Sequence, residues 1–144
     1  MKMKMWSKAA VAGAAMTAAA LAFATPASAS SPKNGSCEII EVCYYYNSDY
    51  AGSMIDYEGD EYSHHDDHFI SSGAGQGQVV GNNAASVYCN DGPLFSCTTY
   101  FNSGYAGDSY TILGGKRANL PAWLKNNNAS SSLWYSGGCS GPGC

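Results

Sequence analysis

The sequence predicts an all-β domain, an antiparallel sandwich of two Greek-key motifs. The first observation is an internal duplication: residues 45–52 (YYNSDYAG) return as residues 100–107 (YFNSGYAG), and residues 82–86 (NNAAS) return as residues 127–131 (NNASS). Two signatures that recur in the same order indicate one supersecondary unit used twice. The second observation is that short runs rich in tyrosine and β-branched residues alternate with Gly and Asn, without a sustained helical period.

The N-terminus has the pattern of a secretory signal peptide. Lys2, Lys4 and Lys8 form a basic leader, residues 9–24 are an apolar run, and residues 27–29 (ASA) offer a cleavage site with small residues. The apolar run is short for a membrane span, so a residual anchor is the less favoured alternative. We therefore expect residues 1–29 to be removed and the protein to be secreted.

The charge of the mature chain narrows the choice of partners. Loss of the three leader lysines changes the formal net charge from −4 to −7. A nucleic-acid partner or an anionic membrane needs a basic surface, so neither is expected.

All six cysteines lie in the exported part, which predicts a disulfide framework. Six cysteines allow 15 pairings, but these fall into three close pairs in the sequence, and we expect local pairing. A zinc site or a nucleophilic thiol is the less favoured alternative, because the sequence has no Cys-x-x-Cys motif. The cysteines are Cys37, Cys43, Cys89, Cys97, Cys139 and Cys144.

The first motif begins with a β-branched and aromatic strand at residues 39–46, followed by turn residues at 47–49. A second strand at residues 53–57 completes a hairpin. Shorter strand candidates lie on either side of a glycine-rich loop at residues 73–77, and a last strand closes the motif. These later strands are expected at residues 69–70, 78–80 and 86–89.

The second motif repeats this order. Strands are expected at residues 98–101, 109–113 and 131–135, with a polar loop and a possible turn at residues 120–124 before the last strand. The expected organisation is a signal peptide (1–29), a linker (30–36), one monomeric domain (37–135, with motifs of about 37–89 and 97–135) and a Gly/Cys-rich flexible tail (136–144).

These hairpins resemble the Greek-key signature of βγ-crystallins, in which an aromatic residue is followed by Tyr-x-Gly and later by Ser. The matching segments are residues 46–52 with Ser86 and residues 101–107 with Ser131. The signal sequence, the Cys-x5-Cys pair and the paired Tyr-Asn-Ser and Asn-Asn-Ala motifs resemble the secreted metalloproteinase inhibitors of actinobacteria. The resemblance covers about residues 37–135 and implies a βγ-crystallin-like fold and a peptidase inhibitor.

The Asn-rich motifs also resemble the calcium motif of βγ-crystallins, in which two such motifs exchange ligands. Weakly charged oxygen sites of this kind bind calcium at about 10⁻⁴–10⁻³ M. The alternative is that Asn and Ser only form turns with their own backbone. The ligands implied by the resemblance are Asn82, Asn83, Ala84 through its carbonyl, and Ser86 in one motif, and Asn127, Asn128, Ala129 and Ser131 in the other.

The segment between Cys89 and Cys97 has no counterpart in the duplication, and it is the candidate inhibitory loop. An inhibitor that binds like a substrate needs an exposed, extended and stiffened segment. A loop closed by a disulfide, with Pro93 beside Leu94 and Phe95, meets this demand. Thermolysin-like metalloproteases favour large apolar residues after the scissile bond, so Leu94 or Phe95 is the candidate for their pocket. The alternative is an ordinary linker with two apolar residues packed inward.

Residues 61–68 contain all three histidines, His64, His65 and His68, beside several acids. Three imidazoles could hold zinc or copper, but we favour a solvated, pH-responsive loop. For catalysis the sequence offers neither a Gly-x-Ser-x-Gly elbow nor a His-Glu-x-x-His helix. The leading hypothesis is therefore a secreted inhibitor of an extracellular metalloprotease. The first alternative is a calcium-stabilised structural or envelope-associated protein without a protease target, and a crystallin-like killer toxin is a remote third.

Overall fold

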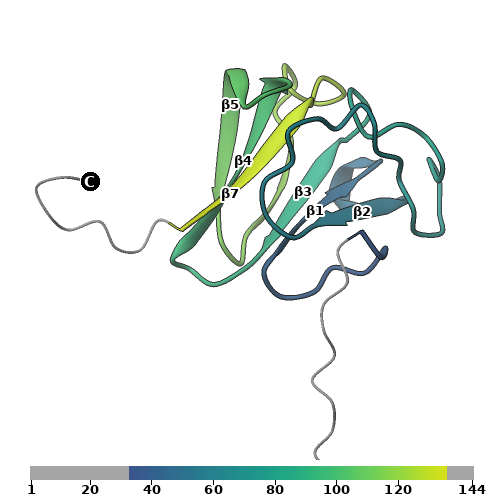
Figure 1. Cartoon of the computed structure of the whole chain (residues 1–144). Helices are drawn as coiled ribbons and strands as arrows, with labels where there is room; N and C mark the ends of the chain where they lie inside the picture. The colour runs from purple at the N-terminus through teal and green to yellow at the C-terminus, as the bar shows by residue number, and fades with distance from the viewer. Residues whose placement is uncertain (1–32, 136–144) are drawn as a thin grey trace, which may run out of the picture.

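The computed structural model describes residues 33–135, which form two antiparallel sheets (Figure 1). The predicted signal peptide, the predicted tail and the pair Cys139 and Cys144 lie outside the described residues. One sheet has the strand order β2-β1-β3-β6 and the other β5-β4-β7. The elements are β1 (Glu41–Tyr45), the short 3-10 helix η1 (Ser48–Tyr50), β2 (Met54–Tyr57), β3 (Ser86–Asn90), β4 (Phe95–Asn102), β5 (Ala106–Leu113), β6 (Arg117–Asn119) and β7 (Ser130–Tyr135).

Each motif contributes to the sheet of the other. Strand β6 belongs to the second motif but pairs with β3, with Val87 opposite Ala118. In return, Glu61 of the first motif forms an isolated antiparallel bridge with Ser131 of β7. This exchange is the Greek-key arrangement, so the predicted all-β sandwich of two Greek keys is confirmed.

The hydrophobic core lies between the two sheets. At its centre the hydroxyl groups of Tyr44 on β1 and Thr99 on β4 are 2.7 Å apart and hydrogen-bonded. Burial raises the pKa of Tyr44 to about 12, so this phenol is protonated at physiological pH. The buried cluster comprises Val42, Tyr44, Ile55, Tyr57, Phe69, Val80, Ala84, Val87, Cys89, Cys97, Ile112, Leu120 and Leu124.

A serine clamp folds the hairpin of the first motif back onto its sheet. The Ser86 hydroxyl donates to the carbonyl of Asn47 (2.7 Å) and accepts from the N–H of Tyr50 (3.0 Å). Gly52 follows with φ of 79°, in the left-handed region that favours glycine. The recurring Tyr-x-Gly sequence therefore has a local cause, a sharply folded turn held by one buried hydroxyl.

The second motif has the same clamp, but one residue away from the expected position. The hydroxyl of Ser130, not that of Ser131, donates to Asn102 O (2.7 Å) and accepts from Tyr105 N–H (3.0 Å). Gly107 repeats the φ of 79°. The two hairpins are thus related by the 55-residue offset seen in the sequence, whereas the two clamp serines, Ser86 and Ser130, are related by an offset of 44 residues.

The Asn-rich loops follow this corrected register, with an offset of 44 residues. The N–H of Asn82 donates to Asn128 O (2.8 Å), and the N–H of Asn126 donates to Ala84 O (2.9 Å). Asn126 lies 44 residues after Asn82, and Ala84 lies 44 residues before Asn128, so each hydrogen bond is the counterpart of the other. Both donors have positive φ, 63° and 58°. The second Asn motif therefore starts at Asn126.

Three secondary-structure predictions were wrong in detail. Residues 69–70 and 78–80 are not strands; only His68 and Val79 form an isolated bridge there. The expected polar loop of the second motif contains β6, which pairs antiparallel with β3.

Within the described residues, no helix has the length and apolar character needed to cross a membrane.

Candidate functional site

Two of the three predicted disulfides lie within the described residues, and both have the expected local pairing. They are Cys37–Cys43 and Cys89–Cys97. Cys89 is on β3 and Cys97 on β4, so the second disulfide connects the two sheets where the chain passes from the first motif to the second. The chain between these cysteines is thereby held at both ends.

The candidate inhibitory loop is a compact turn and not the extended segment expected from the sequence. The N–H of Phe95 donates to Gly92 O (3.0 Å), and the N–H of Gly92 donates to the carboxylate of Asp91 (2.6 Å). Pro93 and Leu94 occupy the tip, and the side chain of Leu94 is 52% exposed. The turn presents Leu94 to solvent, whereas Phe95 is half-buried.

A second turn, between β5 and β6, lies against this first turn. The N–H of Gly114 donates to Phe95 O (2.8 Å), and the N–H of Gly115 donates to Cys89 O (2.8 Å). The N–H of Cys89 donates in turn to Lys116 O (3.0 Å). We call residues 114–116 the brace. The brace was not predicted from the sequence, since a Gly-Gly pair between two strands indicates only a turn.

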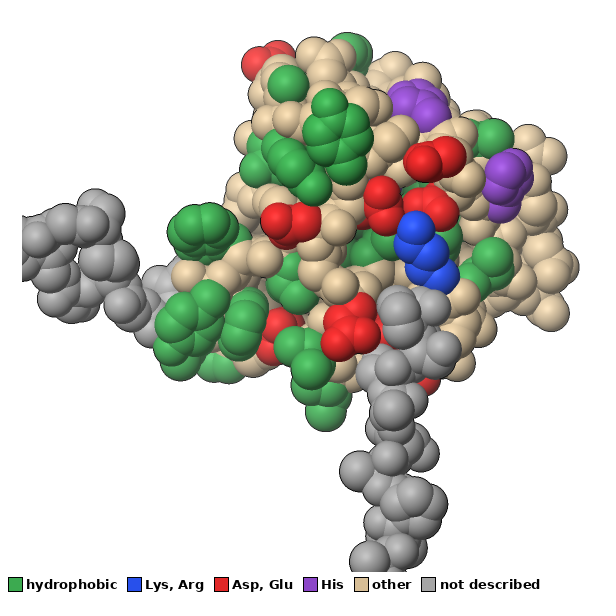
Figure 2. All heavy atoms as spheres, in the orientation of Figure 1, with side chains coloured by type: hydrophobic (Ala, Val, Ile, Leu, Met, Phe, Trp, Pro, Cys, Tyr) green, Lys and Arg blue, Asp and Glu red, His purple; other side chains and the backbone are tan. Residues whose placement is uncertain are grey.

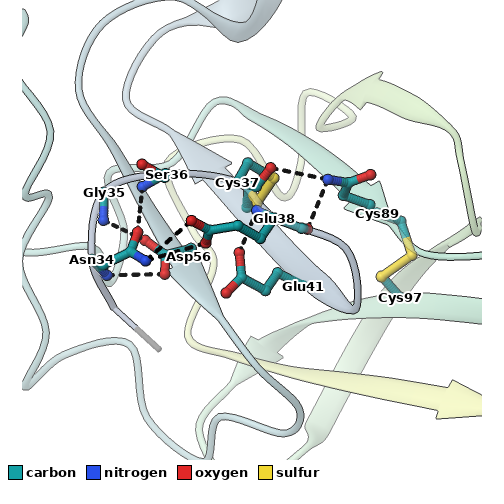
Figure 3. The surroundings of a disulfide bond; sticks show 11 residues. Asn34, Gly35, Ser36, Cys37, Glu38, Glu41, Asp56, Cys89 and Cys97 are labelled. Atoms are coloured by element: carbon teal, nitrogen blue, oxygen red, sulfur yellow. Dashed lines mark hydrogen bonds between the residues drawn. A yellow bond between two sulfur atoms is a disulfide. The ribbon is translucent and has the colours of Figure 1, made fainter. Parts of the chain in front are cut away.

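The first disulfide loop holds the other side of the turn (Figure 3). The side-chain amide of Asn90 donates to the carbonyls of Cys37 (3.0 Å) and Glu38 (2.7 Å). The N–H of Ile40 donates to Asn90 O (2.8 Å). Both disulfides therefore lie at one end of the domain, and the turn between Cys89 and Cys97 is supported from two sides.

Apolar side chains surround this end of the second sheet. The rings of Phe95 and Tyr135 have centroids 5.1 Å apart. Leu113 and Trp134 both lie opposite Ser96 in the sheet and are exposed, Trp134 by 69%. Figure 2 shows hydrophobic side chains gathered at the lower left of the domain. The turn is thus part of a larger apolar surface.

The predicted calcium ligands differ in availability, and Asn128 is fully engaged. Its amide oxygen accepts from Ala84 N–H (2.9 Å), and its amide nitrogen donates to Val80 O (3.0 Å) and to His64 Nδ1 (2.9 Å). Ser131 is also buried, with its hydroxyl 3.0 Å from His64 Nε2. These two side chains connect the motifs to each other.

Asn83 and Asn127 have side-chain oxygens that remain available. The amide nitrogen of Asn83 donates to Gly81 O (3.2 Å), and that of Asn127 donates to Lys125 O (3.4 Å), two bonds related by the 44-residue offset. Within the described residues no hydrogen bond to either side-chain oxygen occurs. Such oxygens, together with backbone carbonyls, are the ligand type that calcium accepts.

The surroundings of the two Asn loops are not equivalent. A pocket of about 260 Å³ lies beside the first hairpin, and Lys125 points its ammonium group to the hydroxyl of Ser48 there (2.7 Å). The position equivalent to Lys125 in the first motif is Gly81. The positive charge of Lys125 is therefore not repeated at the equivalent position of the first motif. The pocket is lined by Tyr46, Asn47, Ser48, Asn83, Ala85, Lys125 and Asn126.

The expectation of a solvated histidine loop was wrong for His64, which is fully buried. Its ring stacks on Tyr57 (centroids 5.3 Å apart) and contacts the edge of Tyr44 (4.9 Å). Because Asn128 donates to Nδ1, the neutral ring carries its proton on Nε2 and donates to Ser131. Burial lowers the pKa of His64 to about 3. His65, by contrast, is exposed.

An acidic group on the surface already has a cationic partner. Carboxylate oxygens of Glu61, Asp66 and Asp67 lie within 4.8 Å of one another, and the ammonium of Lys33 is 2.9 Å from both Glu61 and Asp67. On the face shown in Figure 2, acidic side chains lie beside a basic side chain. Lys33 thereby fastens the first described residues, expected to be part of a linker, to the domain.

Comparison with solved structures defines the class of this domain. A structure described as "Evolution of the eye lens beta-gamma-crystallin domain fold" matches with a TM-score of 0.53 and 15% identity, covering 76% of this chain and 93% of that one. The N-terminal domain of Protein S matches with a TM-score of 0.50 and 22% identity, covering 66% and 96%. At these identities the likeness establishes the fold, that of a βγ-crystallin domain.

The sequence places the chain more narrowly. The profile of peptidase inhibitor family I36 matches residues 30–112, more than half of the chain, and the chain belongs to this family. A search of curated proteins finds no match. The chain is therefore a peptidase inhibitor on a βγ-crystallin fold and not an enzyme, and its partner is a protease.

Proposed function

We propose that this chain is a secreted inhibitor of an extracellular metalloprotease, and that the turn between Cys89 and Cys97 enters the protease active site. One observation carries the proposal: a turn closed by a disulfide and held by backbone hydrogen bonds presents an exposed Leu94 at its tip. A segment already held in one conformation loses less conformational entropy on binding. Two disulfides in the described domain are also typical of an extracellular compartment.

Of the two candidate residues for the protease pocket, the geometry supports Leu94. Phe95 contacts Tyr135, and both its N–H and its carbonyl are hydrogen-bonded within the domain. Leu94 is exposed at the tip. A metalloprotease that accepts a large apolar residue after the scissile bond would therefore receive Leu94, with the peptide bond between Pro93 and Leu94 at its metal.

Titration of thermolysin with the purified protein tests this proposal, with peptide hydrolysis as the readout. Leu94→Ala should raise the inhibition constant by about 10- to 100-fold, because a buried leucine contributes about 1.5–3 kcal/mol. Phe101→Ala, which truncates an exposed side chain near the other end of β4, is the matched control. If a large excess of the wild-type protein leaves hydrolysis unchanged, inhibition of thermolysin-type enzymes is excluded.

We also propose weak calcium binding at the two Asn-rich loops. The support is the pair of available oxygens on Asn83 and Asn127, together with exposed Asn82 and Asn126 beside them. The engaged side chains of Asn128 and Ser131 do not fit a role as ligands, so the sites have few donors. If the protein binds calcium but does not inhibit a protease, the alternative function is favoured, that of a calcium-stabilised structural protein.

A further inference from the structure

We propose that Gly114 is a positioning residue for inhibition: it holds the turn between Cys89 and Cys97 from outside the disulfide loop. This inference rests on the proposed function and names a residue that lies on a different turn of the second motif. Gly114 lies outside the disulfide-closed loop in the sequence, and its N–H donates to the backbone carbonyl of Phe95.

The two turns approach so closely that only glycine fits at position 114. A β-carbon there would lie 1.9 Å from the carbonyl oxygen of Gly92 and 2.9 Å from that of Asp91. Both are backbone atoms and cannot rotate away. Gly114 is not among the described residues with positive φ, so the obstacle to alanine at this position is the lack of space and not a left-handed φ.

This close approach fixes the chain on both sides of the tip. Gly114 N–H donates to Phe95 O after the tip, and Gly115 N–H donates to Cys89 O before it. When a protease hydrolyses the bond between Pro93 and Leu94, one water molecule adds across the C–N bond and yields a carboxylate and an amine. The brace and the disulfide keep these two new ends from separating, which favours resealing over release.

Gly77 provides a control outside the candidate loop. A β-carbon on Gly77 would meet no atom within 4 Å, and its φ of 79° lies in the left-handed region that favours glycine. Gly77→Ala therefore adds the same methyl group and strains the first motif without displacing the candidate loop. Gly114→Ala adds it against the candidate loop and pushes the loop away.

The experiment incubates wild type, Gly114→Ala and Gly77→Ala with a catalytic amount of thermolysin, and detects nicking of the turn by mass spectrometry before and after reduction. Gly114→Ala should be nicked about tenfold faster and should inhibit about tenfold more weakly, whereas Gly77→Ala should inhibit and resist nicking as wild type does. Thermal melting checks that both variants are folded. Nicking of Gly114→Ala at the wild-type rate overturns the proposal.

The two proposals fail in different ways. If wild type does not inhibit but Gly114→Ala is still nicked faster, the proposed function fails and the brace stands. If wild type and Gly114→Ala inhibit equally and resist nicking equally, the brace fails and the function stands. Should Gly114→Ala not fold, hydrogen exchange of wild type decides: slow exchange of the Gly114 and Gly115 amides supports the brace, and exchange at the rate of an open loop overturns it.

Discussion

The connection between β2 and β3 in the first motif runs through residues 58–85 and buries His64, Phe69 and Val80, whereas the corresponding connection in the second motif, residues 114–129, is shorter and contains the brace, β6 and a turn at residues 122–126. The serine clamps and the reciprocal bonds between the Asn loops are nevertheless the same. The two motifs therefore share the hydrogen bonds of the serine clamps and the Asn loops. They differ in the segments that connect these hydrogen-bonded residues.

The copies also depend on each other unequally. Asn128 of the second motif reaches into the first and bonds to Ala84, Val80 and His64. The residue equivalent to Asn128 in the first motif is Ala84, which has no polar side chain to return the contact. One buried side-chain amide therefore makes contacts that the first motif does not return. Substitution of Asn128 is expected to have the largest effect on the free energy of unfolding.

Asn128→Ala would give the second motif the residue of the first, and it should be the most destabilising change. It leaves the N–H of Ala84, the carbonyl of Val80 and Nδ1 of His64 without this partner in a buried place, at a cost of about 3–5 kcal/mol. Chemical denaturation measures the free energy of unfolding. Asn127→Ala, at a partly exposed neighbour, should cost less than about 1 kcal/mol. A cost for Asn128→Ala as small as that of the control would refute the asymmetry.

The clamp serines test the similarity of the two motifs. Ser86→Ala and Ser130→Ala should each lower the free energy of unfolding by about 2–3 kcal/mol, because each removes a hydroxyl that both donates and accepts in a buried place. Ser132→Ala, whose half-buried hydroxyl faces that of Tyr100 at 3.2 Å, should cost less. Strongly unequal losses for Ser86 and Ser130 would mean that the clamps are not equivalent.

His64 exists only in the first motif and should make stability depend on pH. Its pKa of about 3 in the folded protein lies below the ordinary value of 6.5, so the unfolded chain binds more protons between these values. Stability is then fully present above pH 6.5 and falls as the pH decreases toward 3, by about 2 kcal/mol at pH 5.

Denaturation curves at pH 7 and pH 5 measure this effect. His65→Gln, which changes the exposed neighbour, should keep the pH dependence, and His64→Gln should reduce it. Equal loss of stability at pH 5 in His64→Gln and wild type would assign the pH dependence to other groups.

Much of this fold could be predicted because the residues that recur in the two motifs are those that form turns. Gly52 and Gly107 occupy left-handed backbone positions, and such positions restrict the residue type strongly enough to leave a visible repeat. The one-residue error at Ser131 had a physical cause as well. The segment 126–132 (NNNASSS) fits a repeat in two registers, and the hydrogen bonds of Ser130 and Asn126 distinguish them.

The features that escaped prediction depend on contacts between distant segments. Gly114 resembles any turn glycine until the carbonyl of Gly92 is placed beside it. His64 lies in an acidic run typical of a surface, and it is buried because Asn128 and Ser131 supply partners from the other motif. Local patterns cannot report such pairings, since His64 is separated from Asn128 and Ser131 by 64 and 67 residues, and Gly114 belongs to a different turn from Gly92.

Calcium should give the smallest effect and should distinguish the two Asn loops. At 5 mM calcium, a site with a dissociation constant of about 1 mM would add about 1 kcal/mol to the free energy of unfolding. The ammonium group of Lys125 lies in the pocket that Asn83 and Asn126 line, so it competes with a cation bound in that pocket. Lys125→Met should therefore enlarge the difference in melting temperature between samples with calcium and samples with chelator.

Lys116→Met is the control, an equal change of charge at an exposed position on the β5–β6 turn, and it should leave this difference as in wild type. A melting temperature unaffected by millimolar calcium in all three proteins would remove the calcium proposal, and an equal rise in all three would show that Lys125 does not set the loops apart.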